Sequence, residues 1–344
     1  GKLYGLPISI KDCIIVKDLE SKAGSKILEG YEPVFDATVI KKIKDEGGLI
    51  LGKTSQDVFG FGSFNVNVGL GYKVPKNPYD KKRATGGSSG AAAGITQKIK
   101  SPHIAISEST GGSIAAPAAY CGVYGLTPTY GRVSRYGLMD YANSMDKIGV
   151  MGKDIDDVAL MLKIISGYDE RDSTSINIDV PDFTKKVYDK FKIAIINEGF
   201  SKEVQKEIKE NVINKLTKYD QVSLPLGFKL GVQTYYLISM SEASTNLSKL
   251  CGMRYGKHEK LIGDFNEYFT NVRSKYFSKE AKRRIILGTF ARMSGYRDAY
   301  YLKALKVRTK MINEYKELFK KYDLLITPTM PNIAPRFDEI EKLK

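Results

Sequence analysis

The sequence predicts an α/β fold in which strands and helices alternate around a largely parallel sheet. Two strand–helix–strand patterns carry this prediction, one over residues 6–53 and the other over residues 192–224. A helical crossover returns the chain to the end of the sheet where the first strand began, so the two strands that it joins run parallel. The length of 344 residues is also enough to bury one large core.

The first pattern begins with an apolar run at residues 6–10 that ends in the charged pair Lys11-Asp12, which is typical of a short strand. Residues 37–46 place apolar side chains on one side of a helix, and two glycines follow that stop it. Residues 49–53 are then expected to form a buried strand. Next come a helix at 89–95 and a strand at 104–106.

A further helix is predicted between Asp154, which caps it, and Gly167, which ends it. The second pattern consists of a strand at 192–196, an amphipathic helix that Ser201 is expected to cap, and a strand at 221–224. The remaining predicted elements are a polar loop over residues 168–182 and helices over residues 231–250, 281–290 and 294–322.

Two Gly-Gly-Ser clusters, at residues 86–90 and 111–113, are the candidates for a reactive site. Their serines, Ser88 and Ser113, lie 25 residues apart in the sequence. Glycine lets the backbone approach a reacting atom closely and leaves N–H groups free to point inward. A serine that follows such a turn is a candidate nucleophile if a neighbouring group takes its proton.

Histidine and lysine are the two candidate bases. The chain has two histidines, His103 and His258, and both are expected to be solvated loop residues. Glu259 follows His258 directly, but an adjacent acid is not a recognisable triad motif, so a Ser-His-Asp triad has little support. The alternative is a Ser-Lys arrangement in which Lys11, at the end of the first strand, is the base.

Composition restricts the class of protein. The formal net charge of +15 favours an anionic partner such as tRNA, although lysines on solvated helix faces would give the same count. The three cysteines are widely spaced and form no zinc or disulfide pattern, which suits a reducing cytoplasm. A phosphate-binding loop motif is absent, and no apolar run is long enough to span a bilayer.

Three segments, in this order and at this spacing, resemble the three motifs of the amidase signature family: Gly-Leu-Pro-Ile-Ser-Ile-Lys-Asp at 5–12, Gly-Gly-Ser-Ser-Gly at 86–90, and Thr-Gly-Gly-Ser-Ile at 110–114. Other segments resemble the A-type subunit of the aminoacyl-tRNA amidotransferases within this family, namely residues 125–138, 169–173, 241–244 and 283–289. The resemblance implies a mixed, largely parallel central sheet with helices on both faces. It also implies a single amidase domain over residues 1–344, incomplete at both ends.

The resemblance also implies roles for the site residues. Ser113 is expected to be the nucleophile, Ser88 to relay its proton, and Lys11 to act as the base, with a cis peptide bond before Ser88. A lysine acts as a base only in its neutral form, which burial favours. Backbone N–H groups of Thr110, Gly111, Gly112 and Ser113 are expected to form the oxyanion hole. Arg284, or alternatively Arg283, would bind the α-carboxylate of glutamine.

The function implied is that of a glutaminase subunit, which releases ammonia for the amidation of Glu-tRNA(Gln) or Asp-tRNA(Asn). Its expected partners are B- and C-type subunits. tRNA, ATP and magnesium would bind mainly to those partners, and this chain would hold no cofactor or metal. A stand-alone amidase acting on another small amide is one alternative. The other is a weakened scaffold, because Ser109 and Ala115 stand where the family usually has aspartate and arginine. Glu108 is also unusual, and could replace the missing acid in part.

Overall fold

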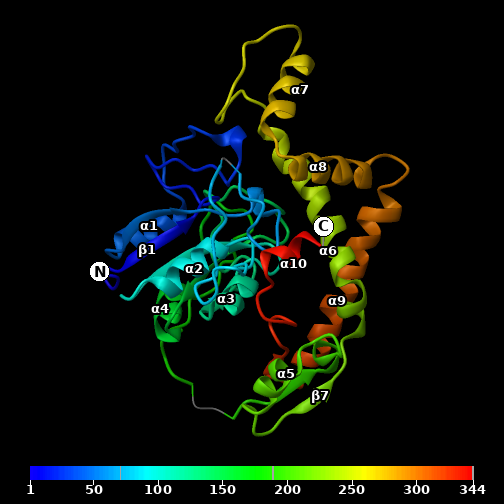
Figure 1. Cartoon of the computed structure of the whole chain (residues 1–344). Coiled ribbons are helices and arrows are strands. Elements are labelled where there is room, and N and C mark those ends of the chain that lie inside the picture. Colours follow the sequence, from blue (N-terminus) through cyan, green and yellow to red (C-terminus); the bar gives the residue numbers. More distant parts are fainter. Residues whose placement is uncertain (70, 188–189, 343–344) are drawn as a thin grey trace. The chain divides into compact units, whose positions relative to one another are not determined.

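The computed structural model describes residues 1–69, 71–187 and 190–342, which form two compact units. The first unit comprises Gly1–Lys185, Ala243–Ile285 and Ala334–Lys344, and the second comprises Lys186–Glu242 and Ile286–Ile333. Figure 1 shows the course of the chain through both. The single domain predicted over residues 1–344 stays a prediction, because two compact units can belong to one folding domain.

A five-stranded sheet forms the centre of the first unit in the described part of the chain, with the strand order β2-β1-β3-β5-β4. Its strands are β1 (Pro7–Lys11), β2 (Leu49–Thr54), β3 (Ile104–Ser109), β4 (Tyr124–Leu126) and β5 (Lys147–Gly152). β1 pairs in parallel with both β2 and β3, whereas β5 is antiparallel to β3 and β4. The predicted parallel strands are confirmed, while β4 and β5 were not predicted and make the sheet mixed.

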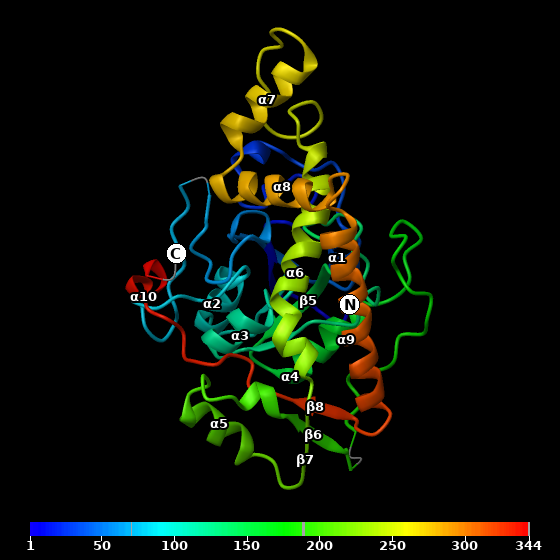
Figure 2. The same ribbon diagram turned by 90° about the vertical axis from the view of Figure 1, so that its right-hand side faces the viewer.

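Helices cover both faces of this sheet. A Cβ on Gly149 of β5 would meet Ile114, which directly precedes α3 (Ala115–Cys121), and a Cβ on Gly152 would meet Val158 of α4 (Ile155–Ile165). Residues three apart on a strand point to opposite faces, so α3 and α4 lie on opposite sides. α1 (Thr38–Asp45) packs with α4, and α2 (Gly90–Lys98) lies beside α3 in both ribbon views (Figures 1 and 2).

Local signals placed most of these elements correctly. The predicted cap of α4 is confirmed, because the Asp154 side chain accepts a hydrogen bond of 2.7 Å from the N–H of Asp156. The buried environment predicted for β2 is wrong, since Leu49 and Leu51 are 56% and 50% exposed. These two side chains share one face of β2, which is an edge strand of the sheet.

The second unit has a three-stranded parallel sheet in the order β7-β6-β8, and its strands lie side by side in Figure 2. β6 (Ile193–Ile196) is followed by α5 (Lys206–Ile213) and β7 (Asp220–Val222), which confirms the second strand–helix–strand pattern. β8 is Leu324–Ile326. The predicted cap at Ser201 is wrong, because a 3-10 turn at Asn197–Phe200 comes first and α5 begins only after Gln205.

The later helices are α6 (Pro225–Asn246), α7 (Phe265–Tyr276), α8 (Lys279–Arg292), α9 (Lys303–Phe319) and α10 (Phe337–Glu341). Three of them, α6, α8 and α9, differ at their ends from the predicted bounds, and α7 and α10 were not predicted. The helix predicted to start at residue 294 begins later, because Gly295 has a φ of +84° and a π-helical turn at Asp298–Leu302 precedes α9. Among the described residues, none of the helices combines the length and apolar character that crossing a membrane requires.

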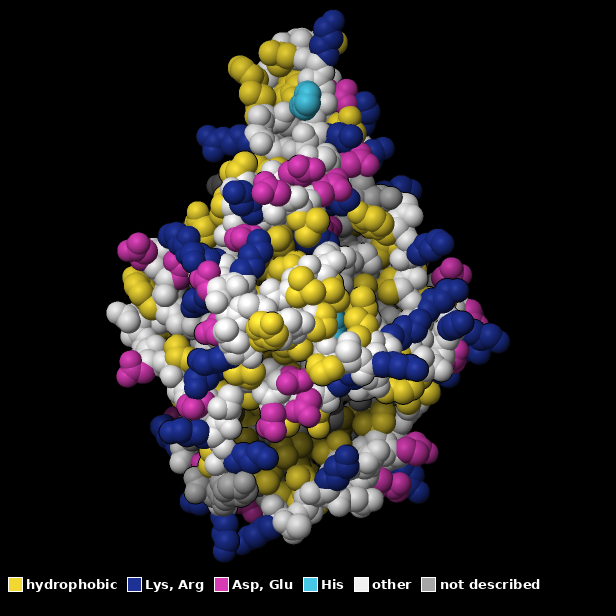
Figure 3. Space-filling model, turned by 90° about the vertical axis from the view of Figure 1, so that its left-hand side faces the viewer, with side chains coloured by type: hydrophobic (Ala, Val, Ile, Leu, Met, Phe, Trp, Pro, Cys, Tyr) yellow, Lys and Arg dark blue, Asp and Glu magenta, His cyan; other side chains and the backbone are white. Residues whose placement is uncertain are grey.

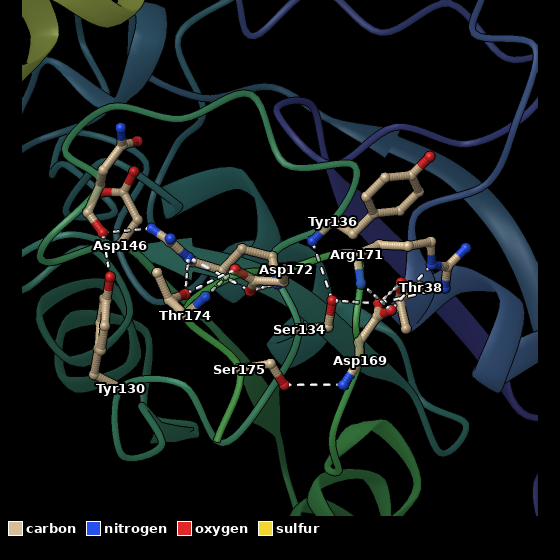
Figure 4. Close-up of polar contacts among 12 residues, drawn as sticks. Thr38, Tyr130, Ser134, Tyr136, Asp146, Asp169, Arg171, Asp172, Thr174 and Ser175 are labelled. Atoms are coloured by element: carbon tan, nitrogen blue, oxygen red, sulfur yellow. Dashed lines mark hydrogen bonds and ion pairs between the residues drawn. The ribbon is translucent and has the colours of Figure 1, made fainter. Parts of the chain in front are cut away.

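The acidic motif at residues 169–173 has a structural role within the first unit. Figure 4 shows Asp169 between Thr38, Ser134 and Arg171. Its carboxylate accepts hydrogen bonds from the hydroxyls of Thr38 and Ser134, and the Arg171 guanidinium donates to it at 3.0 Å. Burial alone would raise the pKa of Asp169, but these hydrogen bonds lower it below the ordinary range. The motif thus ties the start of α1 to the loop that contains Ser134.

Small side chains allow close packing between α2, α3 and the sheet. The buried cluster here contains Ala92, Ala93, Ala105, Ile114, Ala118, Cys121 and Met151. Alanines at the contact points let helix backbones approach a sheet closely, and interiors of this density have little space for added atoms. This packing holds α2, and the serine cluster that precedes it, against β3.

We predict that Ala93→Leu lowers the free energy of unfolding by about 1–3 kcal/mol, because extra methylene groups overpack a dense core. Ala91 is a matched control on the same helix, since its side chain is only half-buried. Ala91→Leu should therefore change stability by less than about 0.5 kcal/mol. Urea unfolding of both variants measures the difference, and equal losses would contradict the close packing inferred for this face of α2.

Candidate active site

Lys11 is the centre of the candidate site. It is the last residue of β1, and its side chain is fully buried. Its Nζ lies 2.7 Å from Ser88 Oγ, 2.9 Å from the Glu108 carbonyl oxygen and 2.9 Å from Glu108 Oε2. The parallel pairing of β1 with β3 brings Lys11 close to Glu108. Ile10 is opposite Ile106, Lys11 follows Ile10, and Glu108 lies two residues beyond Ile106.

The first serine cluster requires glycine at several positions. The peptide bond between Gly87 and Ser88 is cis, as the resemblance implies, and Gly86 has a φ of +79°. A Cβ on Gly87 would lie 2.3 Å from Asp57 Oδ2, and one on Gly90 would lie 2.1 Å from Thr85 Oγ1. These glycines therefore make room for the turn that directs the Ser88 hydroxyl to Lys11.

The second serine cluster forms the turn between β3 and α3. Ser113 is 8% exposed and Ser88 is fully buried. Within the part of the chain that the structure describes, Ser113 Oγ makes no hydrogen bond to Ser88 or Lys11, so the structure joins the lysine to the first serine only. The N–H groups of Gly111, Gly112 and Ser113 donate to no described protein acceptor, and a Cβ on Gly112 would meet nothing within 4 Å. These donors are thus not used within the described protein, and the oxyanion hole expected from them and Thr110 stays a prediction.

Glu108 and Asp146 extend the site beyond the predicted residues. Both carboxyl groups are buried, and Thr110 Oγ1 lies 2.8 Å from Glu108 Oε1 and 2.8 Å from Asp146 Oδ1. The other oxygen of Asp146 accepts the N–H groups of Tyr141 at 2.7 Å and Ala142 at 2.9 Å. Burial, and then the nearby charge of Glu108, raise the pKa of Asp146 well above its usual value. No local sequence signal marks Asp146 as part of a site.

Asp57 supports the first serine cluster and was also missed. It is fully buried and accepts N–H groups from Asn65 at 2.9 Å and Asn67 at 2.8 Å, which closes the loop that packs on Gly87. Burial raises the pKa of Asp57 to about 6, against the lowering effect of these hydrogen bonds. Its role is to hold the backbone around the serine turn.

The two histidines are placed away from the chemistry. His103 is 1% exposed, so the solvated environment predicted for it is wrong. Its Nδ1 lies 3.1 Å from Thr96 Oγ1, and burial lowers its pKa to about 4. His258 is exposed, as predicted. Neither contacts Ser88 or Ser113 in the described structure, and this geometry favours Lys11 over a histidine base.

Arg284 points into the first unit, whereas the Arg283 side chain is 54% exposed. Arg284 is 5% exposed, and its guanidinium lies 4.7 Å from the centre of the Phe61 ring and contacts the Tyr141 hydroxyl. Phe61 follows Gly60, where an added Cβ would lie 3.6 Å from Ser88 Oγ and 3.7 Å from Glu108 Oε2. Arg284 also donates to Glu280 at 2.7 Å, so a bound carboxylate would share this cation with Glu280.

Polar contacts identify this site better than cavity size does. An apolar cavity of about 200 Å³ in the first unit is lined by Phe59, Leu138 and Leu250 among others, and none of Lys11, Ser88 and Ser113 lines it. Among the described residues, His, Cys, Asp and Glu side chains do not gather in groups of three or more that could hold a metal ion. The site therefore offers two serines, a buried lysine and free N–H donors, which together suit acyl transfer.

Comparison with known proteins agrees with this chemistry. The family model described as Amidase matches residues 1–344. The A-type subunit of glutamyl-tRNA(Gln) amidotransferase from Sulfurihydrogenibium sp. (strain YO3AOP1) is 44% identical over 347 residues, which cover 98% of this chain and 71% of that protein. The protein of the same name from Archaeoglobus fulgidus is 43% identical over 344 residues, which cover 99% and 74%. The crystal structure of its counterpart from Thermotoga maritima matches with a TM-score of 0.79 at 36% identity, covering 98% of this chain and 70% of that one.

We predict that Lys11→Met destabilises the protein by about 3–5 kcal/mol at neutral pH, because it leaves the buried Glu108 carboxylate without its partner. Adding Glu108→Gln to Lys11→Met should recover most of the lost stability, since no charge then remains unpaired. Chemical denaturation of the single and double variants measures this. A single variant as stable as the wild type would contradict the ion pair.

Proposed function

Because the chain belongs to the Amidase family, we propose that it is the glutaminase subunit of a tRNA-dependent amidotransferase and releases ammonia from glutamine. The observation that carries this proposal is the buried contact of 2.7 Å between Lys11 and Ser88, which belong to the first and second family motifs. It occurs in a chain that is 44% identical to the A-type subunit of a glutamyl-tRNA(Gln) amidotransferase.

The proposed reaction begins with attack by Ser113 on the side-chain amide carbon of glutamine. Ser88 accepts the Ser113 proton and passes a proton toward Lys11, whose Nζ lies 2.7 Å from Ser88 Oγ. The N–H groups of Gly111, Gly112 and Ser113, together with that of Thr110, stabilise the oxyanion; one such donor contributes about 2.7–4 kcal/mol to the transition state. Protonation of the leaving nitrogen releases ammonia, and water then hydrolyses the acyl-enzyme.

Arg284 is the proposed partner of the glutamine α-carboxylate. Its guanidinium is held by Glu280, Tyr141 and Phe61 in one orientation, and a planar guanidinium can bind a carboxylate through two parallel hydrogen bonds. Arg283 is the weaker candidate because its exposed side chain bonds to Glu280 through both Nε and a terminal nitrogen.

The proposed partners are B- and C-type subunits, as expected for a chain similar to the A-type component of an amidotransferase. ATP and magnesium would act in the partner that activates the tRNA-bound acid, in the cytoplasm. On the face drawn in Figure 3, Lys and Arg side chains lie among acidic and apolar ones. The net charge of +15 would still favour an anionic partner such as tRNA, which we propose is bound mainly by the partner subunits.

One observation bears on the second candidate, a catalytically weakened scaffold. Ser109 and Ala115 stand where the family usually has an aspartate and an arginine. Ser109 Oγ donates at 2.9 Å to the Gly111 carbonyl oxygen, and Ala115 is the first residue of α3. A local hydrogen bond thus replaces the charged pair in holding the turn, and the Ser113 turn keeps its N–H donors free. This favours an active enzyme over an inactive scaffold.

We predict that Ser113→Ala abolishes ammonia release from glutamine and leaves stability almost unchanged, because only the nucleophilic oxygen is lost. Hydroxylamine should trap the acyl group of the wild type as a hydroxamate and should trap none with the variant. His103→Ala serves as a control and should keep its turnover within a few-fold of the wild type. Turnover by a pure Ser113→Ala sample would mean that another group is the nucleophile.

We predict that Arg284→Ala raises the KM for glutamine by about 10–100-fold, which corresponds to losing a charge-assisted hydrogen bond of about 1.5–3 kcal/mol. A simple amide without a carboxylate should be hydrolysed nearly as before, because the loss affects binding and not the chemical step. Arg283→Ala is the matched control and should change the KM for glutamine little. Equal losses on both substrates would make Arg284 a structural residue.

A further inference from the structure

We propose that Glu108 is the final acceptor of the proton that leaves Ser113, and that Ser88 and Lys11 carry this proton to it. This relay depends on the proposed amide chemistry at Ser113 and adds a carboxylate to the two serines and the lysine. Two features of the site lead to it. One is the set of hydrogen-bond partners of Lys11 Nζ, and the other is the position of Thr110 between two carboxyl groups.

The contacts of Lys11 fit an ammonium group. Its Nζ has three acceptors, which are Ser88 Oγ at 2.7 Å and the carbonyl and Oε2 oxygens of Glu108, each at 2.9 Å. An ammonium has three N–H donors and a neutral amine has two. A neutral lysine could make the same three contacts by accepting the Ser88 hydroxyl proton, but it would leave Glu108 as a buried anion without a counter-ion. The resting site is an ion pair.

The hydroxyl of Thr110 shows which carboxyl group is charged. A hydroxyl has one proton to donate, yet Thr110 Oγ1 lies 2.8 Å from Glu108 Oε1 and 2.8 Å from Asp146 Oδ1. One of the two carboxyl groups must therefore be protonated and donate to Oγ1. Glu108 has Lys11 as its cation, whereas Asp146 accepts only the two N–H groups of Tyr141 and Ala142 at its other oxygen.

The charged groups around Asp146 agree with its being the protonated one. Burial raises the pKa of Asp146, and so does the negative charge of Glu108, which contacts the same Thr110 hydroxyl. Lys147 follows it in the sequence, but its Nζ bonds to the carbonyl oxygens of Thr110 and Met145. Asp146 thus donates to Thr110, Thr110 donates to Glu108 Oε1, and Glu108 Oε2 faces Lys11 as a carboxylate.

A proton can then move without a stable neutral lysine. Lys11 gives one proton to Glu108 Oε2, and the amine that remains accepts the proton of Ser88, which accepts that of Ser113. The Ser113 oxygen forms a bond to the amide carbon, and the carbonyl electrons move to the oxyanion. When the carbon–nitrogen bond breaks, the protons return along the same path to the leaving nitrogen. Ammonia departs, and the ion pair of Lys11 with Glu108 is restored.

Glu108→Gln tests the relay, because glutamine keeps the size of glutamate and one acceptor oxygen but cannot take up the proton. The readout is the rate at which Ser113 reacts with a fluorophosphonate probe, since this reaction requires loss of the Ser113 proton and does not require glutamine. We expect the rate to fall at least a hundredfold at every pH between 6 and 10. Lys11→Met should lose a similar amount, and the double variant should lose no more than either single one, as expected for groups that act as a unit.

The state of Asp146 is tested without any activity. A carboxyl whose pKa is raised by folding makes the wild type less stable as pH rises from the unfolded value of about 3.9 toward the folded value. Asp146→Asn keeps a donor to Thr110 but cannot ionise. Its ratio of folded to unfolded protein, relative to the wild type, should rise by up to about tenfold per pH unit in this window. A ratio independent of pH would show an ionised Asp146 and would overturn the proposed arrangement.

The labelling experiment also separates the two proposals. If Glu108→Gln is labelled at the wild-type rate, neutral Lys11 alone is the base and the relay is wrong. The same conclusion holds if Glu108→Gln keeps the full maximal rate and only the pH below which labelling slows becomes lower. A wild type that the probe does not label would also refute it. Loss of labelling in Glu108→Gln, with a wild type that is labelled but releases no ammonia from glutamine, would support the relay and refute the glutaminase function.

Discussion

The buried ion pair between Lys11 and Glu108 is the interaction on which the rest of the site depends. Both side chains are almost completely removed from water, and their charged atoms are 2.9 Å apart. A charge at this depth is tolerated only where hydrogen bonds replace its lost hydration. Ser88, the Glu108 carbonyl and Thr110 supply those bonds. The ion pair therefore depends on the positions of the turn around Gly87 and of the end of β3, which carry these hydrogen-bonding groups.

Parallel pairing of β1 with β3 brings together residues of this site that lie far apart in the sequence. The motifs identify the residues, but their spacing along the chain does not show that they are in contact. Lys11 ends one strand and Glu108 lies near the end of the other, 97 residues away. Local patterns predicted both strands, and the glycine clusters indicated the two serine turns. The strand order is decided by packing across the whole sheet, so the ion pair and the role of Asp146, which precedes an unpredicted strand, could not be read from the sequence.

The two errors in predicted burial have the same origin. Proline and serine beside His103 indicate an exposed loop, yet α2 covers this segment and Thr96 of that helix bonds the ring. The apolar run at residues 49–53 indicates a buried strand, yet β2 lies at the edge of its sheet and exposes Leu49 and Leu51. In both cases the local residues predicted the type of element correctly. The burial of its side chains depends on which element, distant in the sequence, packs against that segment.

Charge balance gives the departures from the family pattern a common explanation. Replacing an aspartate and an arginine by Ser109 and Ala115 removes one charge of each sign, so the net charge of the site is unchanged. Glu108 then adds a negative charge beside a second buried acid, Asp146. Two adjacent carboxylates cannot both be stable at this depth when Lys11 is the one cation that contacts either of them among the described residues. In the proposed arrangement Asp146 keeps its proton and donates it to the Thr110 hydroxyl, which contacts both carboxyl groups. Glu108 then remains the carboxylate that pairs with Lys11.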